Sequence, residues 1–379
     1  MTNRWYTWML AGGVSALAVL AAGCKKKTDE IPVGAYLSLT GSDSTFGIDT
    51  KEGIELALDE INAQGGIKGK RVRLLVEDNK STAAETTQKV QQLIDRDKVV
   101  AVLGEVASSR SKAGGLICNT KKVPMVTPSS TAVEVTQGRP YVFRTCFTDA
   151  QQGEAAARFV RDTLRKNTAG VFYAAQDTYS SGLAKVFRAK FEAFGGKVVI
   201  EKDYQKGETN FSTYLRELKG ANPEIIFVPI YYNEMVTLAR QAKNEGMSGA
   251  MFMGGDGWDS TDLLEGAGGD LEGAHFTNHY SPDVPWENSR IFITSFKAKY
   301  GHEPNSLAAQ GYDAARVLFD AMTRATEVKP EAIREALAAT KDFKGATGTM
   351  TMDSDRNVKK PVVVVRITGK AFKFAAEIQ

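Results

Sequence analysis

Small hydroxyl side chains stand at the carboxyl ends of two predicted strands in this 379-residue chain. Ser108 follows the apolar segment VVAVLGEV, and Ser129 and Thr131 follow the segment VPMVTP. Ligands of open α/β sheets bind outside the carboxyl ends of the strands. Hydroxyls and free backbone N–H groups at the start of a helix suit an anion such as a carboxylate. These positions therefore predict an anion site.

Aromatic side chains and one carboxylate occupy the corresponding strand ends in the second half of the chain. Tyr179, Tyr231 and Asp256 each follow an apolar run. A partly desolvated Asp256 suits an ammonium group, which it would bind through charge-assisted hydrogen bonds. An anion site and a cation site together fit a zwitterion, so a free amino acid is the expected ligand. Each residue alone has a structural explanation as a helix cap, a core aromatic or a turn residue. Their shared location at strand ends favours binding.

Catalytic and metal-binding patterns find little support in the sequence. The chain has three histidines, of which His275 and His279 lie four residues apart. That spacing suits a metal on a helix, but their segment is strand-like and lacks a third ligand, so surface or hydrogen-bonded histidines are favoured. GGIKGKR lacks the first glycine of a phosphate loop and the hydroxyl residue after Lys70. We therefore expect no enzyme activity, no metal and no cofactor.

The N-terminus reads as an export signal. An apolar run follows Arg4 and ends in small residues before Cys24, which is typical of a secretory signal peptide over residues 1–23. The pattern resembles the lipobox of bacterial lipoproteins, although Ala21 stands where leucine is commoner. Lipid attachment at Cys24 is therefore expected. A plain signal peptide or an uncleaved membrane anchor remains the alternative.

Residues 24–30 form an expected polar tether between the lipid and the folded body. The chain carries a formal net charge of +3, and the tether alone holds three lysines, Lys25–Lys27. Without the tether and the signal peptide the body is close to neutral, so nucleic-acid binding is not expected. Two cysteines remain, Cys118 and Cys146. In an exported protein a disulfide between them is favoured over two buried thiols.

The body alternates predicted strands and helices from Ile31 onward. Repeated βα units with apolar strands indicate parallel sheets covered on both faces. The alternation restarts near residue 150, which predicts two similar α/β lobes. Three helices are expected around 288–300, 305–324 and 330–340. GTMTMD and PVVVVRIT then read as a strand pair, antiparallel or at a sheet edge.

Several motifs together resemble one protein family. They are LTGSDSTFG, GIELALDEINAQGGIKGKRVRLLVEDNKS, GEVASSRS, VPMVTPSSTAVEVT, YVFRTCFTDAQQG and FSTYLRELK. The chain from about residue 31 is similar to the type I periplasmic binding proteins for branched-chain and related amino acids. That resemblance implies two Rossmann-like lobes joined by a three-stranded hinge. It places lobe 1 at 31–148 and 280–347, and lobe 2 at 149–279 and 348–379.

The resemblance also assigns roles to the polar residues. Ser108 and Thr131 would hold the carboxylate of the ligand. The Ser129 carbonyl, the Thr131 hydroxyl and Asp256 would hold its ammonium group. Asp256 stands where a glutamate is common in the family, so the acid is kept but is one methylene shorter.

Aromatic residues would complete the site. By similarity, Tyr179 and Tyr231 close it from the second lobe, and Phe46 lies near the side chain of the ligand. Trp258 is a candidate for narrowing the pocket around the shortened Asp256. This departure leaves the identity of the amino acid open.

The expected protein is a monomeric, lipid-anchored receptor of the periplasm or cell envelope. It would bind an L-amino acid, most readily one of branched-chain or aliphatic type, and deliver it to an ABC permease in the inner membrane. The same fold with an amide or an aromatic acid as ligand is the first alternative. A sensory ligand-binding protein is the second, and an enzyme is the third.

Overall fold

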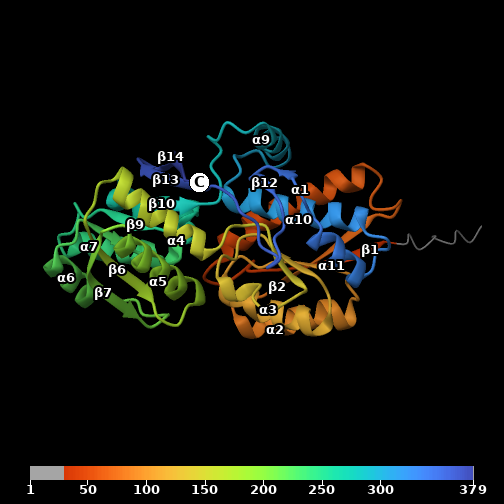
Figure 1. Ribbon diagram of the computed structural model, residues 1–379, viewed down its shortest axis with the longest axis horizontal. Coiled ribbons are helices and arrows are strands. Elements are labelled where there is room, and N and C mark those ends of the chain that lie inside the picture. Colours follow the sequence, from red (N-terminus) through yellow and green to blue (C-terminus); the bar gives the residue numbers. More distant parts are fainter. Residues whose placement is uncertain (1–29, 379) are drawn as a thin grey trace, which may run out of the picture.

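Two lobes lie side by side in the computed structural model, which describes residues 30–378 (Figure 1). Each lobe is built on its own sheet, and parallel strands alternate with helices along the chain. The α/β fold with two lobes predicted from the sequence is confirmed. The residues before Glu30, including the predicted signal peptide, tether and Cys24, lie outside the described part of the chain.

The first lobe contains a five-stranded sheet in the order β2-β1-β3-β4-β5. All neighbouring strands are parallel, as the buried apolar runs predicted. The strands are β1 (Ile31–Leu37), β2 (Val72–Asp78), β3 (Val102–Leu103), β4 (Met125–Thr127) and β5 (Val142–Arg144). The connecting helices are α1 (Ser44–Ala63), α2 (Ala83–Gln91) with its π-helical extension η1 (Gln92–Arg96), and α3 (Ser108–Lys121); the short 3₁₀ turn η2 (Val133–Val135) precedes β5.

The second lobe contains a seven-stranded sheet in the order β14-β13-β10-β9-β8-β6-β7. Its strands are β6 (Thr168–Ala174), β7 (Lys197–Tyr204), β8 (Ile225–Phe227), β9 (Phe252–Gly254), β10 (His275–Asn278), β13 (Val362–Thr368) and β14 (Ala371–Ile378). β6 to β10 are parallel, whereas β13 and β14 add to the β10 edge in antiparallel fashion. The α-helices of this lobe are α4 (Asp149–Arg158), α5 (Thr178–Ala193), α6 (Ser212–Ala221), α7 (Tyr232–Asn244) and α8 (Thr261–Ala267). Shorter helical segments are η3 (Phe159–Thr163), η4 (Asp256–Trp258) and η5 (Gly268–Leu271).

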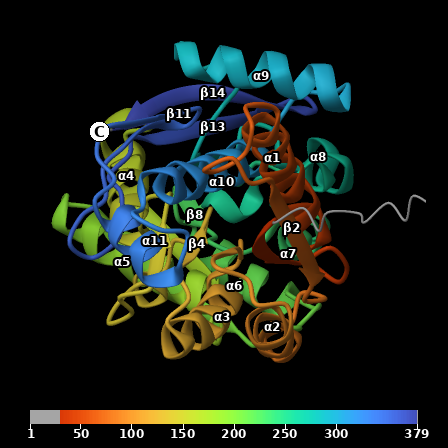
Figure 2. The same ribbon diagram turned by 90° about the vertical axis from the view of Figure 1, so that its right-hand side faces the viewer.

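The last helices return to the first lobe. They are α9 (Glu287–Tyr300), α10 (Ser306–Arg324) and α11 (Pro330–Ala338). α10 lies against α1 so closely that a Cβ on Gly53 would come within 1.9 Å of the Ala308 carbonyl oxygen. A Cβ on Gly311 would similarly meet the Thr50 carbonyl oxygen at 2.3 Å. Glycine at both positions therefore permits the backbone contact between the two helices (Figure 2).

A short hairpin, β11 (Phe343–Gly345) and β12 (Gly348–Met350), precedes the final strands. β12 pairs with β11, and β13 pairs with β10 and β14, so the expected pairing of GTMTMD with PVVVVRIT is wrong. The Asp313 carboxylate of α10 accepts the backbone N–H groups of Ala346 and Thr347, which fixes the turn of the hairpin to the first lobe. The chain reaches the second sheet only with β13, after the crossing expected at residue 348.

The segments that connect the lobes are tied together by a buried lysine. The Lys360 ammonium donates to the Thr145 carbonyl at 3.3 Å and to Gln310 Oε1 at 3.0 Å. Thr145 lies between β5 and α4, where the chain first passes from one lobe to the other, and Lys360 lies in the last passage. Burial lowers the pKa of Lys360 to about 8, and the Asp313 carboxylate partly opposes that shift. Gln310 also donates to the Pro128 carbonyl at 3.1 Å, which links this hinge to the loop after β4.

Cys118 and Cys146 are buried free thiols, so the favoured disulfide is wrong. Cys118 is in the last turns of α3, about 15 Å along the helix from its start at Ser108. Cys146 follows β5, and its thiol contacts the Ser130 carbonyl at 3.4 Å, close to the start of α3. The two residues therefore lie toward opposite ends of the first sheet, whereas a disulfide needs Cα atoms within about 7 Å.

None of the helices between residues 30 and 378 combines the length and apolar character that crossing a bilayer requires.

Candidate functional site

One small cavity between the lobes contains all the ligand-binding residues expected from the sequence. Its lining consists of Phe46, Val106, Ser108, Ser129, Thr131, Tyr179, Tyr231, Asp256, Gly257 and Leu307. The sheet and helices of the first lobe supply the hydroxyls, and those of the second lobe supply the tyrosines and the carboxylate. The structure thus brings together residues that are up to 261 positions apart, between Phe46 and Leu307.

The wall that the first lobe contributes to the cavity contains buried hydroxyl groups without hydrogen-bond partners. Ser129 and Thr131 are 2% and 1% exposed, and their hydroxyl oxygens have no hydrogen-bond partner within residues 30–378. The Tyr231 hydroxyl across the cavity is also buried without a partner in that range. Leaving a buried polar group unpaired costs about 1–3 kcal/mol. Three such groups around one cavity indicate a polar ligand that would complete them.

The loop that carries Ser129 and Thr131 is fixed by the residue between them. The Ser130 hydroxyl contacts the carbonyl oxygens of Glu105 and Val106 at 3.0 and 2.7 Å and the Ser111 hydroxyl at 2.6 Å. The Arg144 guanidinium donates to the Ser130 carbonyl at 2.8 Å. These bonds hold the loop in place from the side facing away from the cavity, so its two free hydroxyls are preorganised.

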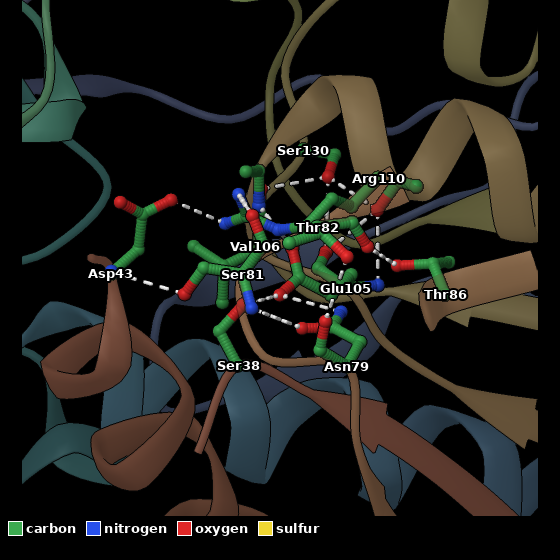
Figure 3. A network of polar contacts seen from close by, with 12 residues as sticks. Ser38, Asp43, Asn79, Ser81, Thr82, Thr86, Glu105, Val106, Arg110 and Ser130 are labelled. Carbon is green, nitrogen blue, oxygen red and sulfur yellow. Dashed lines mark hydrogen bonds and ion pairs between the residues drawn. The ribbon is translucent and has the colours of Figure 1, made fainter. Parts of the chain in front are cut away.

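A buried charged cluster anchors the adjacent strand end (Figure 3). We define the Glu105 cluster as Ser38, Asp43, Asn79, Glu105 and Arg110. The Glu105 carboxylate accepts from the Ser38 hydroxyl at 2.6 Å, the Asn79 amide at 3.2 Å and Arg110 Nε at 2.9 Å. Arg110 forms a second ion pair with Asp43 at 2.7 Å. Because it fixes the turn between β3 and α3, the cluster sets the position of Ser108 at the start of α3.

Asp256 is the acidic residue of the cavity. It is the first residue of η4, one residue beyond the Gly255 that follows β9, and its side chain is 10% exposed. Asp256 Oδ1 accepts from the Gln152 amide at 2.7 Å, and Oδ2 lies 3.0 Å from His279 Nε2. A carboxylate offers about four lone-pair directions, so two of them remain for a ligand. Beside it, the Tyr179 hydroxyl accepts the backbone N–H of Gly257 at 3.1 Å.

Aromatic rings form the remainder of the wall. Tyr179 and Tyr231 are stacked with centroids 5.2 Å apart, and the Phe46 ring meets Tyr231 edge-on at 5.7 Å. Val106 and Leu307 complete the apolar lining. Trp258 does not line the cavity: it is fully buried and donates its indole N–H to the Val228 carbonyl at 3.1 Å. The idea that Trp258 narrows the pocket is therefore wrong.

Contacts across the entrance join the two lobes. The Tyr232 hydroxyl of α7 bonds the Ser42 carbonyl and the Thr45 hydroxyl, each at 3.2 Å. The Thr45 hydroxyl also donates to the Asp262 carboxylate at the start of α8. The backbone N–H of Ser306 donates to Asp259 at 3.1 Å. The structure therefore represents the lobes closed on each other.

Sequence reasoning missed a second carboxyl group near the cavity. Asp149 is 2% exposed, and its carboxylate lies near the Thr131 hydroxyl without forming a hydrogen bond of ordinary geometry within the described chain. Burial raises the pKa of Asp149 well above its usual value, and the negative charge of Asp256 adds to the shift. The sequence TDAQQGE predicts the start of α4, because Thr148 and Gln151 form a capping box there, and Asp149 lies between these two residues. The burial of Asp149 could not be predicted from the sequence, because it depends on how the lobes meet.

The histidines have no metal partners in the described part of the chain. No group of three histidine, cysteine or acidic side chains capable of holding a metal ion occurs there. His279 is a hydrogen-bonded histidine, the structural alternative considered from the sequence, and it is fully buried. The His275 ring packs against Phe159 at 5.3 Å, and burial lowers the pKa of His275 to about 4.

Two facing α/β lobes that close over a small polar cavity define a solute receptor of the periplasmic type. The chain belongs to the periplasmic binding protein family, whose model matches residues 30–371. Membership of this family makes the chain a solute-binding protein.

Individual relatives match over nearly the whole chain. A leucine-, isoleucine-, valine-, threonine- and alanine-binding protein of Pseudomonas aeruginosa is 28% identical, covering 94% of this chain and 93% of its own. The crystal structure of a leucine-binding protein from Thermotoga maritima is 37% identical, with a TM-score of 0.88 over 92% of this chain and 98% of its own. A branched-chain amino acid binding protein from Streptococcus pneumoniae, solved with isoleucine, is 30% identical, with a TM-score of 0.86 over 92% and 99%.

Proposed function

We propose that this protein captures an L-amino acid with an aliphatic, most readily branched, side chain and delivers it to an ABC importer. The observation that carries the proposal is the pairing across one cavity of unpartnered Ser129 and Thr131 hydroxyls with the Asp256 carboxylate. Polar groups of both kinds suit a zwitterion, as the sequence suggested. The relatives that bind leucine, isoleucine and valine support the choice of an amino acid.

The proposed roles follow the chemistry of each wall. Ser108 and Thr131, near the start of α3, hold the ligand carboxylate. The Ser129 carbonyl, the Thr131 hydroxyl and Asp256 bind the ammonium group, and the Tyr231 hydroxyl supplies a further polar contact. Tyr179 closes the site by packing on Tyr231.

The side chain of the ligand meets the apolar lining. Phe46, Val106 and Leu307 offer carbon surface and no titratable group. Burying an aliphatic side chain there contributes about 25 cal/mol for each Å² of apolar surface removed from water. A polar amide side chain would lose its hydrogen bonds to water in the same place. This difference favours aliphatic ligands over amides.

Closure of the lobes encloses the ligand between them. We propose that the lobes are joined by three hinge segments, as the expected division into 31–148 with 280–347 and 149–279 with 348–379 implies, and that the last passage runs between β12 and β13. Each lobe holds part of the ligand, so the ligand binds the closed state better and shifts the balance toward it.

We further propose that the mature protein begins at Cys24, carries a lipid there and acts as a monomer at the outer face of a membrane. Cys24→Ser should release the protein from the membrane fraction. Continued membrane association of an uncleaved Cys24→Ser chain would contradict lipid anchoring and favour an N-terminal transmembrane anchor.

A thermal-shift panel tests the ligand class. Ligand at 100 times its dissociation constant adds about 2.7 kcal/mol to the free energy of unfolding, so a true ligand raises the melting temperature. The panel contains the twenty amino acids, simple amides and aromatic acids, and hits are measured by calorimetry. Leucine, isoleucine or valine should give the largest shift. A response to aromatic acids or amides alone would contradict the proposal.

A further inference from the structure

His279 contacts the acidic residue of the cavity without lining the cavity itself. It directly follows β10, and Asp256 lies two residues after the end of β9, the neighbouring parallel strand. The two side chains therefore meet at the same edge of the second sheet, with His279 Nε2 3.0 Å from Asp256 Oδ2. The cavity lining contains Asp256 and not His279. The imidazole thus reaches the carboxylate from outside the cavity.

The imidazole ring is held rigidly. The Phe147 ring lies 4.1 Å from it between centroids, and both side chains are fully buried. The backbone N–H of His279 donates to Asn278 Oδ1 at 2.8 Å, and the same oxygen accepts from the Ser306 hydroxyl at 2.8 Å. The ring therefore has little freedom to turn away from Asp256.

The ring acts as a neutral donor. His279 Nδ1 has no hydrogen-bond partner in the described chain, so the hydrogen of a neutral ring is assigned to Nε2, where Asp256 accepts it. Burial lowers the pKa of His279 even though Asp256 opposes that shift. A neutral donor orients a carboxylate without cancelling its negative charge, whereas a lysine or arginine in this place would form an ion pair with it.

A second donor fixes the other carboxylate oxygen. Gln152 donates one amide hydrogen to Asp256 Oδ1 at 2.7 Å and another to the Thr277 hydroxyl at 3.0 Å. Gln152 is on α4 and His279 follows β10, so two separate elements orient one carboxylate.

We propose that His279 is a positioning residue: together with Gln152 it fixes the Asp256 carboxylate so that its undiminished charge meets the ammonium group of the ligand. The inference rests on the proposed binding of an amino acid. It adds a residue that contributes to the affinity for the ligand and that the sequence did not indicate.

Substitutions at His279 test the role of its N–H. His279→Leu replaces the imidazole with an apolar side chain of similar size and so removes the N–H donor. His279→Gln provides an amide N–H donor in its place. His275→Leu is the matched control, because His275 is a buried histidine on β10, the strand that His279 follows, and its ring packs against Phe159. L-leucine affinity is measured by calorimetry, and circular dichroism verifies the fold of each variant.

The expected order of affinities is specific. His279→Leu should weaken L-leucine binding about 10- to 100-fold, the range for losing a hydrogen bond to a charged group. His279→Gln should stay within about threefold of the wild-type affinity, and so should the control. Wild-type affinity in a folded His279→Leu variant would overturn the inference.

A spectroscopic measurement on the wild-type protein avoids any folding defect. The chain has three histidines, so the imidazole N–H resonances can be assigned with single substitutions. Saturation with L-leucine should shift the His279 Nε2–H resonance, because its acceptor then shares charge with an ammonium group. The His275 resonance should stay in place. An unmoved His279 resonance in protein that binds leucine would overturn the inference. A wild-type protein that binds no amino acid would instead contradict the proposed function.

Discussion

The Glu105 cluster and the hydroxyl wall of the cavity are both buried at the carboxyl ends of strands in the first sheet. In the cluster, the charged groups of Asp43, Glu105 and Arg110 are paired by hydrogen bonds or ion pairs. In the wall, the hydroxyls of Ser129 and Thr131 have no partner within residues 30–378. The difference teaches that burial alone does not identify a binding residue. Unpaired polar groups that gather around one cavity do.

Three consecutive residues contain the whole contrast. Ser129, Ser130 and Thr131 are each at most 2% exposed. The Ser130 hydroxyl has three hydrogen-bonding partners in the protein. The hydroxyls of its two neighbours form no hydrogen bond of ordinary geometry within the described chain. The middle residue thus stabilises the loop, and the flanking residues are left for a ligand.

Removing the centre of the cluster should produce the largest loss of stability. Glu105→Ala leaves Arg110 with Asp43 as its remaining charged partner and removes one of the two acceptors near the Ser38 hydroxyl. Breaking a buried ion pair costs about 3–5 kcal/mol of unfolding free energy, measurable by urea denaturation. Glu303→Ala, at an exposed ion pair with Lys297, should cost less than about 1 kcal/mol. Equal effects of the two substitutions would contradict the structural role of the cluster.

Neutralising the acidic residue of the cavity should affect binding and spare the fold. Asp256→Asn keeps the shape of the side chain and removes the charge that meets the ligand ammonium. L-leucine affinity should fall about 30-fold or more, with a melting temperature close to that of the unliganded wild-type protein. Calorimetry checks this result. Unchanged affinity would remove Asp256 from the site.

Two neighbouring hydroxyl substitutions sharpen the comparison. Thr131→Val replaces the hydroxyl, whose polar neighbour in the described chain is the Asp149 carboxylate, with a methyl group of similar size. L-leucine affinity should drop about tenfold while the unliganded protein keeps its stability. Ser130→Ala should instead lower the free energy of unfolding by about 1–3 kcal/mol. Calorimetry measures the affinity and denaturation measures the stability of both variants. A loss of stability in Thr131→Val together with a loss of affinity alone in Ser130→Ala would contradict these assigned roles.

The buried Asp149 carboxyl predicts a smaller, pH-dependent effect. Its pKa is raised in the folded state, so ionisation destabilises the fold increasingly as pH rises above the unfolded value of about 3.9. Asp149→Asn should therefore gain about 1 kcal/mol of unfolding free energy at pH 7 relative to wild type. The gain should vanish near pH 3. A gain that is constant across this range would exclude ionisation as its cause.

Local patterns were sufficient to predict most of the strands and helices and the hydroxyls after β4, whereas β5, β11 and β14 were not expected. Apolar runs specify parallel strands, and the rule that ligands bind at their carboxyl ends brought Ser108 and Asp256 into one hypothesis. The hydrogen-bond partners of Asp256 could not be predicted from the sequence, because His279 and Gln152 belong to other elements that meet it only in the folded protein. The disulfide failed for the same reason: Cys118 and Cys146 have no local signal that places them at opposite ends of a sheet.

The contacts that Tyr232 makes with Ser42 and Thr45 bear on the timing of transport. They join the lobes without involving the cavity lining, so each opening must break them whether or not cargo is present. Neutral hydrogen bonds contribute about 1 kcal/mol each. Their loss in Tyr232→Phe should therefore shorten the residence time of the ligand severalfold. Under the proposed function, Tyr232 thus slows the escape of the ligand from the closed lobes.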